Sequence, residues 1–221
     1  MDHFSLAWSA LRAAVAGLAE EDFARPSGCT GWLVRDLVCH LVIDAQDVLI
    51  TLATPAGPDA VPTRDAASYW EVSDRPPTGD DPLDALTVRL AAAYQDPGLL
   101  TFHLDDVGSA AGRAAVLADP KLLVETKGEV LTVADYLGAY VLEWTLHHLD
   151  LIAHLPGDPP APPAATLAEA RALLARVAGA ELPRELSDTD ALLVGTGRRA
   201  PDEAERSAFA AAGVRIPLSL G

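Results

Sequence analysis

Apolar residues recur at helical spacing in the first part of the chain and predict two helices. One stripe runs along the N-terminal segment as far as an acidic run, residues 20–22. Its members are Phe4, Trp8, Leu11, Val15 and Leu18. A turn-rich stretch, residues 25–32, separates this stripe from a longer periodic segment between about Leu33 and Thr54. The apolar positions of that segment are Leu37, Leu41, Val48 and Leu52.

The middle of the chain alternates turn signals with further helical periodicity. Residues 55–82 are rich in proline, glycine and aspartate, so we expect a long connection with one helical turn around Ala66 to Val72. Asp81 suits the N-cap, and Pro82 the first position, of a helix that runs to about Tyr94. A further helix is expected from Gly98 to Leu117.

Two short segments, 122–126 and 129–133, flank Lys127-Gly128 and predict a hairpin or an extended crossing. The clearest helix follows, because helical periodicity continues without interruption from Thr132 to Leu155. Thr132 and Asp135 resemble a capping box at its start.

A proline-rich stretch, residues 157–165, predicts a linker. The tail is expected to hold a helix (Leu167 to Ala178), a short apolar strand (Ala191 to Val194), a helix opened by Pro201, and an extended end. We therefore divide the chain into a helical bundle, 1–156, the linker, and a small α+β C-terminal segment, 166–221.

The charge balance narrows the choice of partners. The formal net charge is -16, which opposes binding to phosphate backbones and anionic lipid. The start lacks the cationic region of a signal peptide, and polar residues interrupt the most apolar segment, Leu37 to Ala53. We expect a cytoplasmic protein that binds neither nucleic acid nor membrane. A homodimer through a helix face is an alternative, although no apolar stripe requires one.

Three residues on two of the predicted helices form a candidate metal site. Glu143 and His147 are four apart, so a helix projects both from one face. His40 lies within the other long helix, and a ligand from a facing helix is how bundles build metal sites. The alternative is a surface hydrogen-bonded pair and an unrelated core histidine. Three protein ligands would leave coordination positions open, as in catalytic sites.

The segment Gly31-Trp32-Leu33-Val34-Arg35-Asp36-Leu37, followed by His40-Leu41, resembles the signature of the mycothiol-dependent maleylpyruvate isomerase N-terminal domain family. Glu143, His147 and Asp150 resemble its second block. This family belongs to the DinB-like four-helix bundles, and the similarity covers most of residues 1–156. The tail LLVGTGRRAP resembles the end of related actinobacterial proteins.

The resemblance implies a bundle in which His40, Glu143 and His147 bind zinc or, alternatively, nickel. Members with known activity bring a low-molecular-weight thiol, mycothiol, to the metal, and the cation stabilises the deprotonated sulfur that attacks an electrophilic carbon. Asp150 is the candidate catalytic residue, placed to orient a ligand or to move a proton. The segment after the linker is short for the larger C-terminal domain of the isomerase, which weakens the case for maleylpyruvate as substrate.

Arg198 and Arg199 follow the predicted strand, in a glycine-containing stretch that ends too close to the C-terminus for a dinucleotide-binding unit. We expect an exposed tight turn. The alternative is that one of them binds a carboxylate at the mouth of the bundle, so both are candidate cofactor-binding residues. Cys39 is expected in the core. For Cys29 we expect no activating histidine, which argues against a cysteine nucleophile.

The sequence thus predicts a mainly α protein, a DinB-like up-down four-helix bundle with a small α+β C-terminal segment. The first functional hypothesis is a metal-dependent isomerase or transferase that uses a small thiol on a small electrophilic substrate. The second is a non-enzymatic bundle that binds a small ligand or a protein, with a structural or vestigial metal site.

Overall fold

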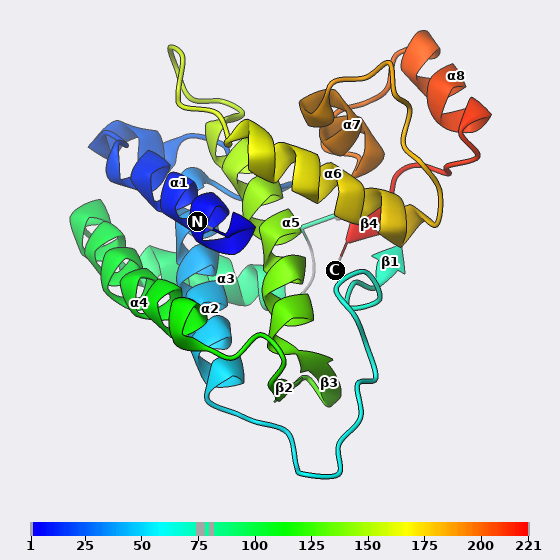
Figure 1. Ribbon diagram of the computed structural model, residues 1–221. Helices are drawn as coiled ribbons and strands as arrows, with labels where there is room; N and C mark the ends of the chain where they lie inside the picture. Colours follow the sequence, from blue (N-terminus) through cyan, green and yellow to red (C-terminus); the bar gives the residue numbers. More distant parts are fainter. Residues whose placement is uncertain (1, 74–77, 80–81, 221) are drawn as a thin grey trace.

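Four long helices form the bundle in a computed structural model that describes residues 2–73, 78–79 and 82–220. They are α1 (His3–Ala16), α2 (Val34–Leu52), α4 (Pro97–Leu117) and α5 (Val133–Ile152). Helix α1 packs against α4 and α5, and α2 packs against the same two helices, so α1 and α2 lie diagonally opposite (Figure 1). The mainly helical fold predicted from periodicity is confirmed.

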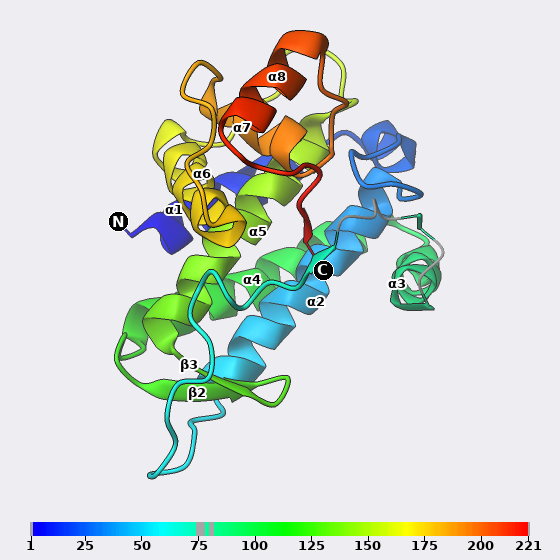
Figure 2. The ribbon, with the colours of Figure 1, turned by 90° about the vertical axis from the view of Figure 1, so that its right-hand side faces the viewer.

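Shorter elements close the bundle. A 3-10 turn, Glu20–Ala24, follows α1, and α3 (Pro82–Ala93) packs on the outer side of α2 (Figure 2). The antiparallel hairpin of β2 (Leu123–Thr126) and β3 (Glu129–Thr132) confirms the hairpin alternative. The expected helical turn is present after Asp65, whose Oδ1 accepts from the amides of Ala67 and Ser68. Asp81, the expected N-cap of α3, lies outside the described residues.

The C-terminal part packs along α5. It consists of α6 (Ala164–Ala178), α7 (Asp188–Gly195), α8 (Glu203–Ala211) and β4 (Ser219–Leu220). Strand β4 pairs antiparallel with β1 (Val72–Ser73), which ties the end of the chain to the long connection after α2. The division into parts 1–156, 157–165 and 166–221 stays a prediction.

One predicted element is wrong. The apolar run Ala191 to Val194 was expected as a strand but lies within helix α7. A short apolar run does not separate a buried strand from a buried helix. Here the residues before it decide, because the Ser187 side chain accepts from the Asp190 amide and caps the helix.

Helix α5 belongs to both hydrophobic cores. On one side, Trp144 stacks on Trp8 of α1 with ring centroids 4.0 Å apart. On the other side, Leu142, Leu146 and Leu149 join the core of the C-terminal part. A helix that is buried on opposite sides carries apolar residues on both, which explains why apolar positions recur along the whole of this segment. None of the described helices combines the length and the apolar composition that a membrane span requires.

The indole of Trp8 packs directly against the backbone of Gly108 in α4. The indole Nε1 of Trp8 donates to the Gly108 carbonyl oxygen at 2.8 Å, and a Cβ at position 108 would lie 2.5 Å from Trp8 Cζ2. We expect Gly108→Ala to destabilise the protein by about 1–3 kcal/mol, because overpacking outweighs the gain in helix propensity. Gly112→Ala is the matched control, since its Cβ would meet Trp8 at an ordinary 3.6 Å. Urea unfolding of both variants tests this, and equal stabilities would contradict it.

Candidate metal centre

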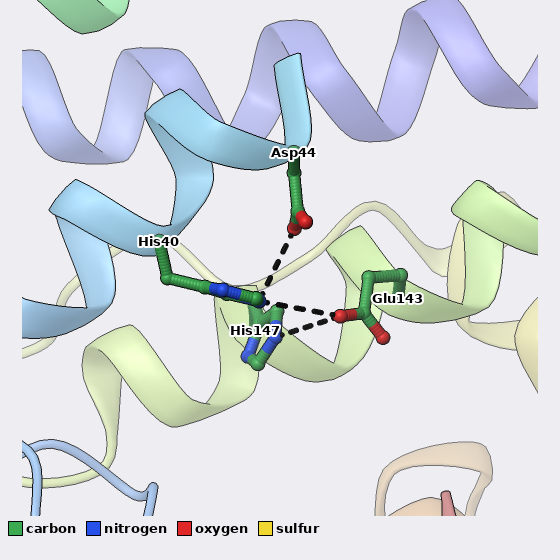
Figure 3. Close-up of side chains that lie close together, drawn as sticks. All are labelled: His40, Asp44, Glu143 and His147. Atoms are coloured by element: carbon green, nitrogen blue, oxygen red, sulfur yellow. Dashed lines mark hydrogen bonds and ion pairs between the residues drawn. The ribbon is translucent and has the colours of Figure 1, made fainter. Parts of the chain in front are cut away.

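Two facing helices each direct an imidazole and a carboxylate at one point (Figure 3). Helix α2 contributes His40 and Asp44, and α5 contributes Glu143 and His147; one ligand atom of each lies within 4.8 Å of the others. Glu143 Oε1 is 3.0 Å from His147 Nε2 and 3.5 Å from His40 Nε2. The structure therefore brings together the three residues that the sequence proposed as ligands.

The cluster is partly buried, with Asp44 and His147 buried and His40 and Glu143 in partial contact with solvent, and it is strongly polarised. Burial alone would lower the pKa of His147, but Glu143 and Asp150 raise it well above its usual value. Conversely, His147 and His40 hold the pKa of Glu143 well below its usual range, against the effect of burial. Burial raises the pKa of Asp44 to about 6. The two carboxylates thus depend on the neighbouring imidazoles for charge compensation, with a smaller contribution from Arg198 to Glu143.

This donor set fits a divalent cation. Imidazole nitrogens and carboxylate oxygens are common ligands of zinc and related ions. In the described part of the chain, Asp44 and Glu143 have no lysine or arginine within ion-pair distance. Asp44 Oδ2 is buried and lacks a hydrogen-bond partner among the described residues. A cation between the four side chains would compensate both features.

Asp150 contacts the His147 ring on the side opposite Glu143. Its Oδ2 lies 3.0 Å from Nδ1 of His147, the ring nitrogen that faces away from Glu143. A proton on Nδ1 leaves Nε2 available for an ion, the arrangement that outer-shell carboxylates impose on metal-binding histidines. Asp150 is 1 % exposed, and Arg198 from the C-terminal part donates to both of its oxygens, at 2.9 Å from Nε to Oδ1 and 3.0 Å from Nη2 to Oδ2.

The loop after the 3-10 turn packs tightly against Asp150. The Gly28 amide donates to the Asp150 carbonyl oxygen at 2.8 Å, and a Cβ at Gly28 would lie 2.8 Å from the Asp150 Cα. Only glycine permits this approach. The loop thereby places Cys29 beside the cluster.

His147 lies beside Cys29, where no activating histidine was expected. The Cys29 Sγ is 3.7 Å from His147 Nδ1 and 3.3 Å from Asp150 Oδ2. Burial raises the pKa of the Cys29 thiol, more than the neighbouring His147 lowers it. The thiol therefore stays protonated at neutral pH and donates to Asp150. No sequence pattern signals this contact, because Cys29 and His147 meet only through tertiary packing of the loop.

The two arginines have different environments. Arg198 is mostly buried and binds Asp150, so the expectation of an exposed turn is wrong for it, and the carboxylate it binds is one of the chain's own. Arg199 pairs with Asp190 and Glu205 away from the cluster. That either binds a cofactor stays a prediction. His154 is exposed, and His148 donates to the Pro160 carbonyl oxygen at 2.9 Å.

Asp44 is the residue of the cluster that sequence reasoning missed. A signal was present, because Asp44 follows His40 by one helical turn in a segment with an apolar core face. Trp32 flanks the cluster, with its ring centroid 5.1 Å from that of His40.

The family model for the mycothiol maleylpyruvate isomerase N-terminal domain matches residues 4–152. The chain belongs to this family. The matched region runs from α1 to α5 and contains Cys29, the four residues of the cluster and Asp150, but not Arg198. Membership indicates a mycothiol-related, DinB-like metal-binding domain, in agreement with the donor set of the cluster. No curated protein and no solved structure matches the chain.

Proposed function

We propose that the protein is a divalent-metal-dependent enzyme that uses a low-molecular-weight thiol such as mycothiol for isomerisation or S-transfer on a small electrophilic substrate. The observation that carries this proposal is the convergence of His40, Glu143 and His147 within a domain of the mycothiol maleylpyruvate isomerase family. We propose zinc as the ion, with nickel as the alternative. A bound divalent cation would supply one effect, the stabilisation of a deprotonated thiol.

The chain's own residues hold the donor atoms in place. Glu143 and His147 are fixed by the same helix, and His40 approaches from α2. Asp150 orients His147 through Nδ1, and Arg198 keeps Asp150 ionised, since the pKa of this carboxyl falls to about 2 despite its burial. Of the two roles considered for Asp150, these contacts favour orientation over proton transfer. We therefore propose Asp150 as a positioning residue.

A separate thiol is needed because the protein's own thiol near the site is poorly suited to attack. Cys29 has a raised pKa and donates to Asp150, on the side of His147 away from Glu143. A buried, protonated thiol is a weak nucleophile. We propose that the protein acts in the cytoplasm, where small thiols are kept reduced.

Metal removal tests the proposal. The purified protein is expected to contain about one equivalent of a divalent ion, as sites with three protein ligands do. Stripping with a chelator should reduce thiol consumption with a reactive electrophile to the uncatalysed rate, and restoring zinc or nickel should recover it. Plasma mass spectrometry and a thiol assay with and without mycothiol measure the two quantities. Protein that neither contains nor takes up these ions would contradict the proposal.

The second hypothesis, a ligand-binding or partner-binding bundle, has its own outcome in the same experiment. A protein that holds one ion tightly but shows no metal-dependent thiol chemistry with any small electrophile would be of this kind.

A further inference from the structure

We infer that Asp44 is a fourth protein ligand of the same cation, so that the centre presents two imidazoles and two carboxylates. This inference rests on the proposed metal centre and goes beyond it, because the three ligands implied by the family do not include Asp44.

The first argument is the repeated geometry of the two helices. His40 and Asp44 are one turn apart on α2, as Glu143 and His147 are on α5. The ligand atoms of all four lie within 4.8 Å of one another. Ligands about 2.0–2.2 Å from a common ion are themselves separated by roughly 3–4 Å, so small side-chain shifts would bring all four onto one ion.

The second argument is the nitrogen that Asp44 faces. Its Oδ2 lies 3.3 Å from Nε2 of His40, the same nitrogen that approaches Glu143. A carboxylate that only oriented His40 would contact Nδ1 and leave Nε2 for the ion, as Asp150 does for His147. Asp44 therefore lies on the ion side of the imidazole, not behind it (Figure 3).

The third argument is the missing partner. Asp44 is 7 % exposed, and its Oδ2 has no hydrogen-bond partner among the described residues. Two other buried carboxylates accept hydrogen bonds: Asp36 Oδ2 accepts from the Leu33 amide at 2.8 Å, although its Oδ1 also lacks a partner among the described residues, and Asp150 accepts from Arg198 at both oxygens. The Asp44 Oδ2 is near His40 Nε2, at 3.3 Å, without making a hydrogen bond, and a buried carboxylate in this state is costly unless a cation compensates it.

A fourth ligand changes the coordination expected at the centre. Two carboxylates neutralise a divalent ion, and four protein ligands fill a tetrahedral site. An external thiol can then bind only if the ion accepts five or six ligands. Zinc, the ion proposed above, would then have to expand its coordination to five ligands, whereas nickel, the alternative, accepts five or six more readily.

Asp44→Asn tests the inference, with Asp47→Asn as the matched control. Asp47 carries the same charge one turn further along α2, at a partly buried position outside the cluster. We expect Asp44→Asn to weaken cobalt and nickel binding by at least about 10–100-fold, the range found for residues that support metal sites. Asp47→Asn should leave the affinity within about twofold, as expected for a charge with no contact to the ion. Competition titration against a chelator measures both affinities.

The visible spectrum of the cobalt-loaded protein gives a second readout. Its bands should change in position or intensity in Asp44→Asn but not in Asp47→Asn, because ligand identity and number set them. Asp44→Glu, which restores a carboxylate, should recover part of the affinity. Recovery in Asp44→Glu would show that the loss in Asp44→Asn comes from the missing ligand and not from a folding defect. Thermal unfolding of the metal-free variants checks the fold directly.

The outcomes distinguish the two proposals. Equal affinities and spectra for Asp44→Asn and Asp47→Asn, in a wild type that binds the ion, would overturn the role of Asp44 and leave the metal centre standing. A wild type that binds no divalent ion would overturn the metal centre itself, and the inference with it.

Discussion

Replacing His147 with alanine is expected to abolish stoichiometric metal binding. His147 contacts Glu143 through Nε2 and Asp150 through Nδ1, so its loss removes one donor and disconnects the outer carboxylate. We expect the affinity for zinc or nickel to fall by more than about 100-fold, beyond the range found for outer-shell substitutions. Thiol-dependent activity should disappear with the ion. Plasma mass spectrometry of the untagged variant measures the bound metal.

His148→Ala is the matched control for this variant. His148 is the next residue in α5, is 2 % exposed, and donates to the Pro160 carbonyl oxygen outside the cluster. Its replacement should lower stability, because a buried polar contact and packing are lost, and should leave about one equivalent of metal. Equal loss of metal in both variants would show that the ion is not held by His147.

Arg198→Ala is expected to cause the largest loss of stability. It leaves the Asp150 carboxylate, which is 1 % exposed, without the one arginine that pairs with it among the described residues. Breaking a buried pair from one side typically costs about 3–5 kcal/mol. The weakened support for His147 should also lower metal affinity by about 10–100-fold. Urea unfolding of the metal-free protein and chelator competition measure the two effects separately.

The loss of stability caused by Arg198→Ala should become smaller as the pH falls. In the wild type the pKa of Asp150 is about 2, below its ordinary 3.8, since Arg198 and His147 outweigh burial. The stabilisation by Asp150 is therefore complete above pH 3.8 and is lost as the pH falls towards 2. Without Arg198, burial should raise this pKa, so the difference between variant and wild type should narrow in acid. Arg199→Ala, which removes only the partly exposed pairs with Asp190 and Glu205, is the control and should cost much less. Equal losses of stability in Arg198→Ala and Arg199→Ala would contradict the stabilising role of the pair between Arg198 and Asp150.

Local periodicity was sufficient to predict the long helices. The segments that became α2 and α5 carry apolar positions at helical spacing over many turns, and Thr132 caps α5 as its sequence suggested. The short run Ala191 to Val194 has too few positions to establish a period, so its helical state depended on the Ser187 cap and on burial against α6. Elements of this length take their conformation from their surroundings.

The candidate site was predictable only as far as residues share a helix. Glu143 and His147 are linked by spacing, and the family signature associates His40 with them. Cys29 and Arg198 reach Asp150 from distant segments, 121 and 48 residues away in sequence. Contacts of this kind depend on how a loop and the C-terminal part pack on α5, and no local pattern encodes them. Asp44 was the exception, since its position one turn after His40 was visible in the sequence.

The double-sided burial of α5 sets the smallest piece of this chain that can be produced in soluble form. A chain cut at the proline-rich linker would retain every residue of the metal cluster but uncover Leu142, Leu146 and Leu149 along one flank of the helix. A row of exposed leucines promotes self-association. It would also release Arg198 from Asp150. The region matched by the family should therefore not be produced alone. Protein for crystallisation or for activity assays should include the C-terminal helices.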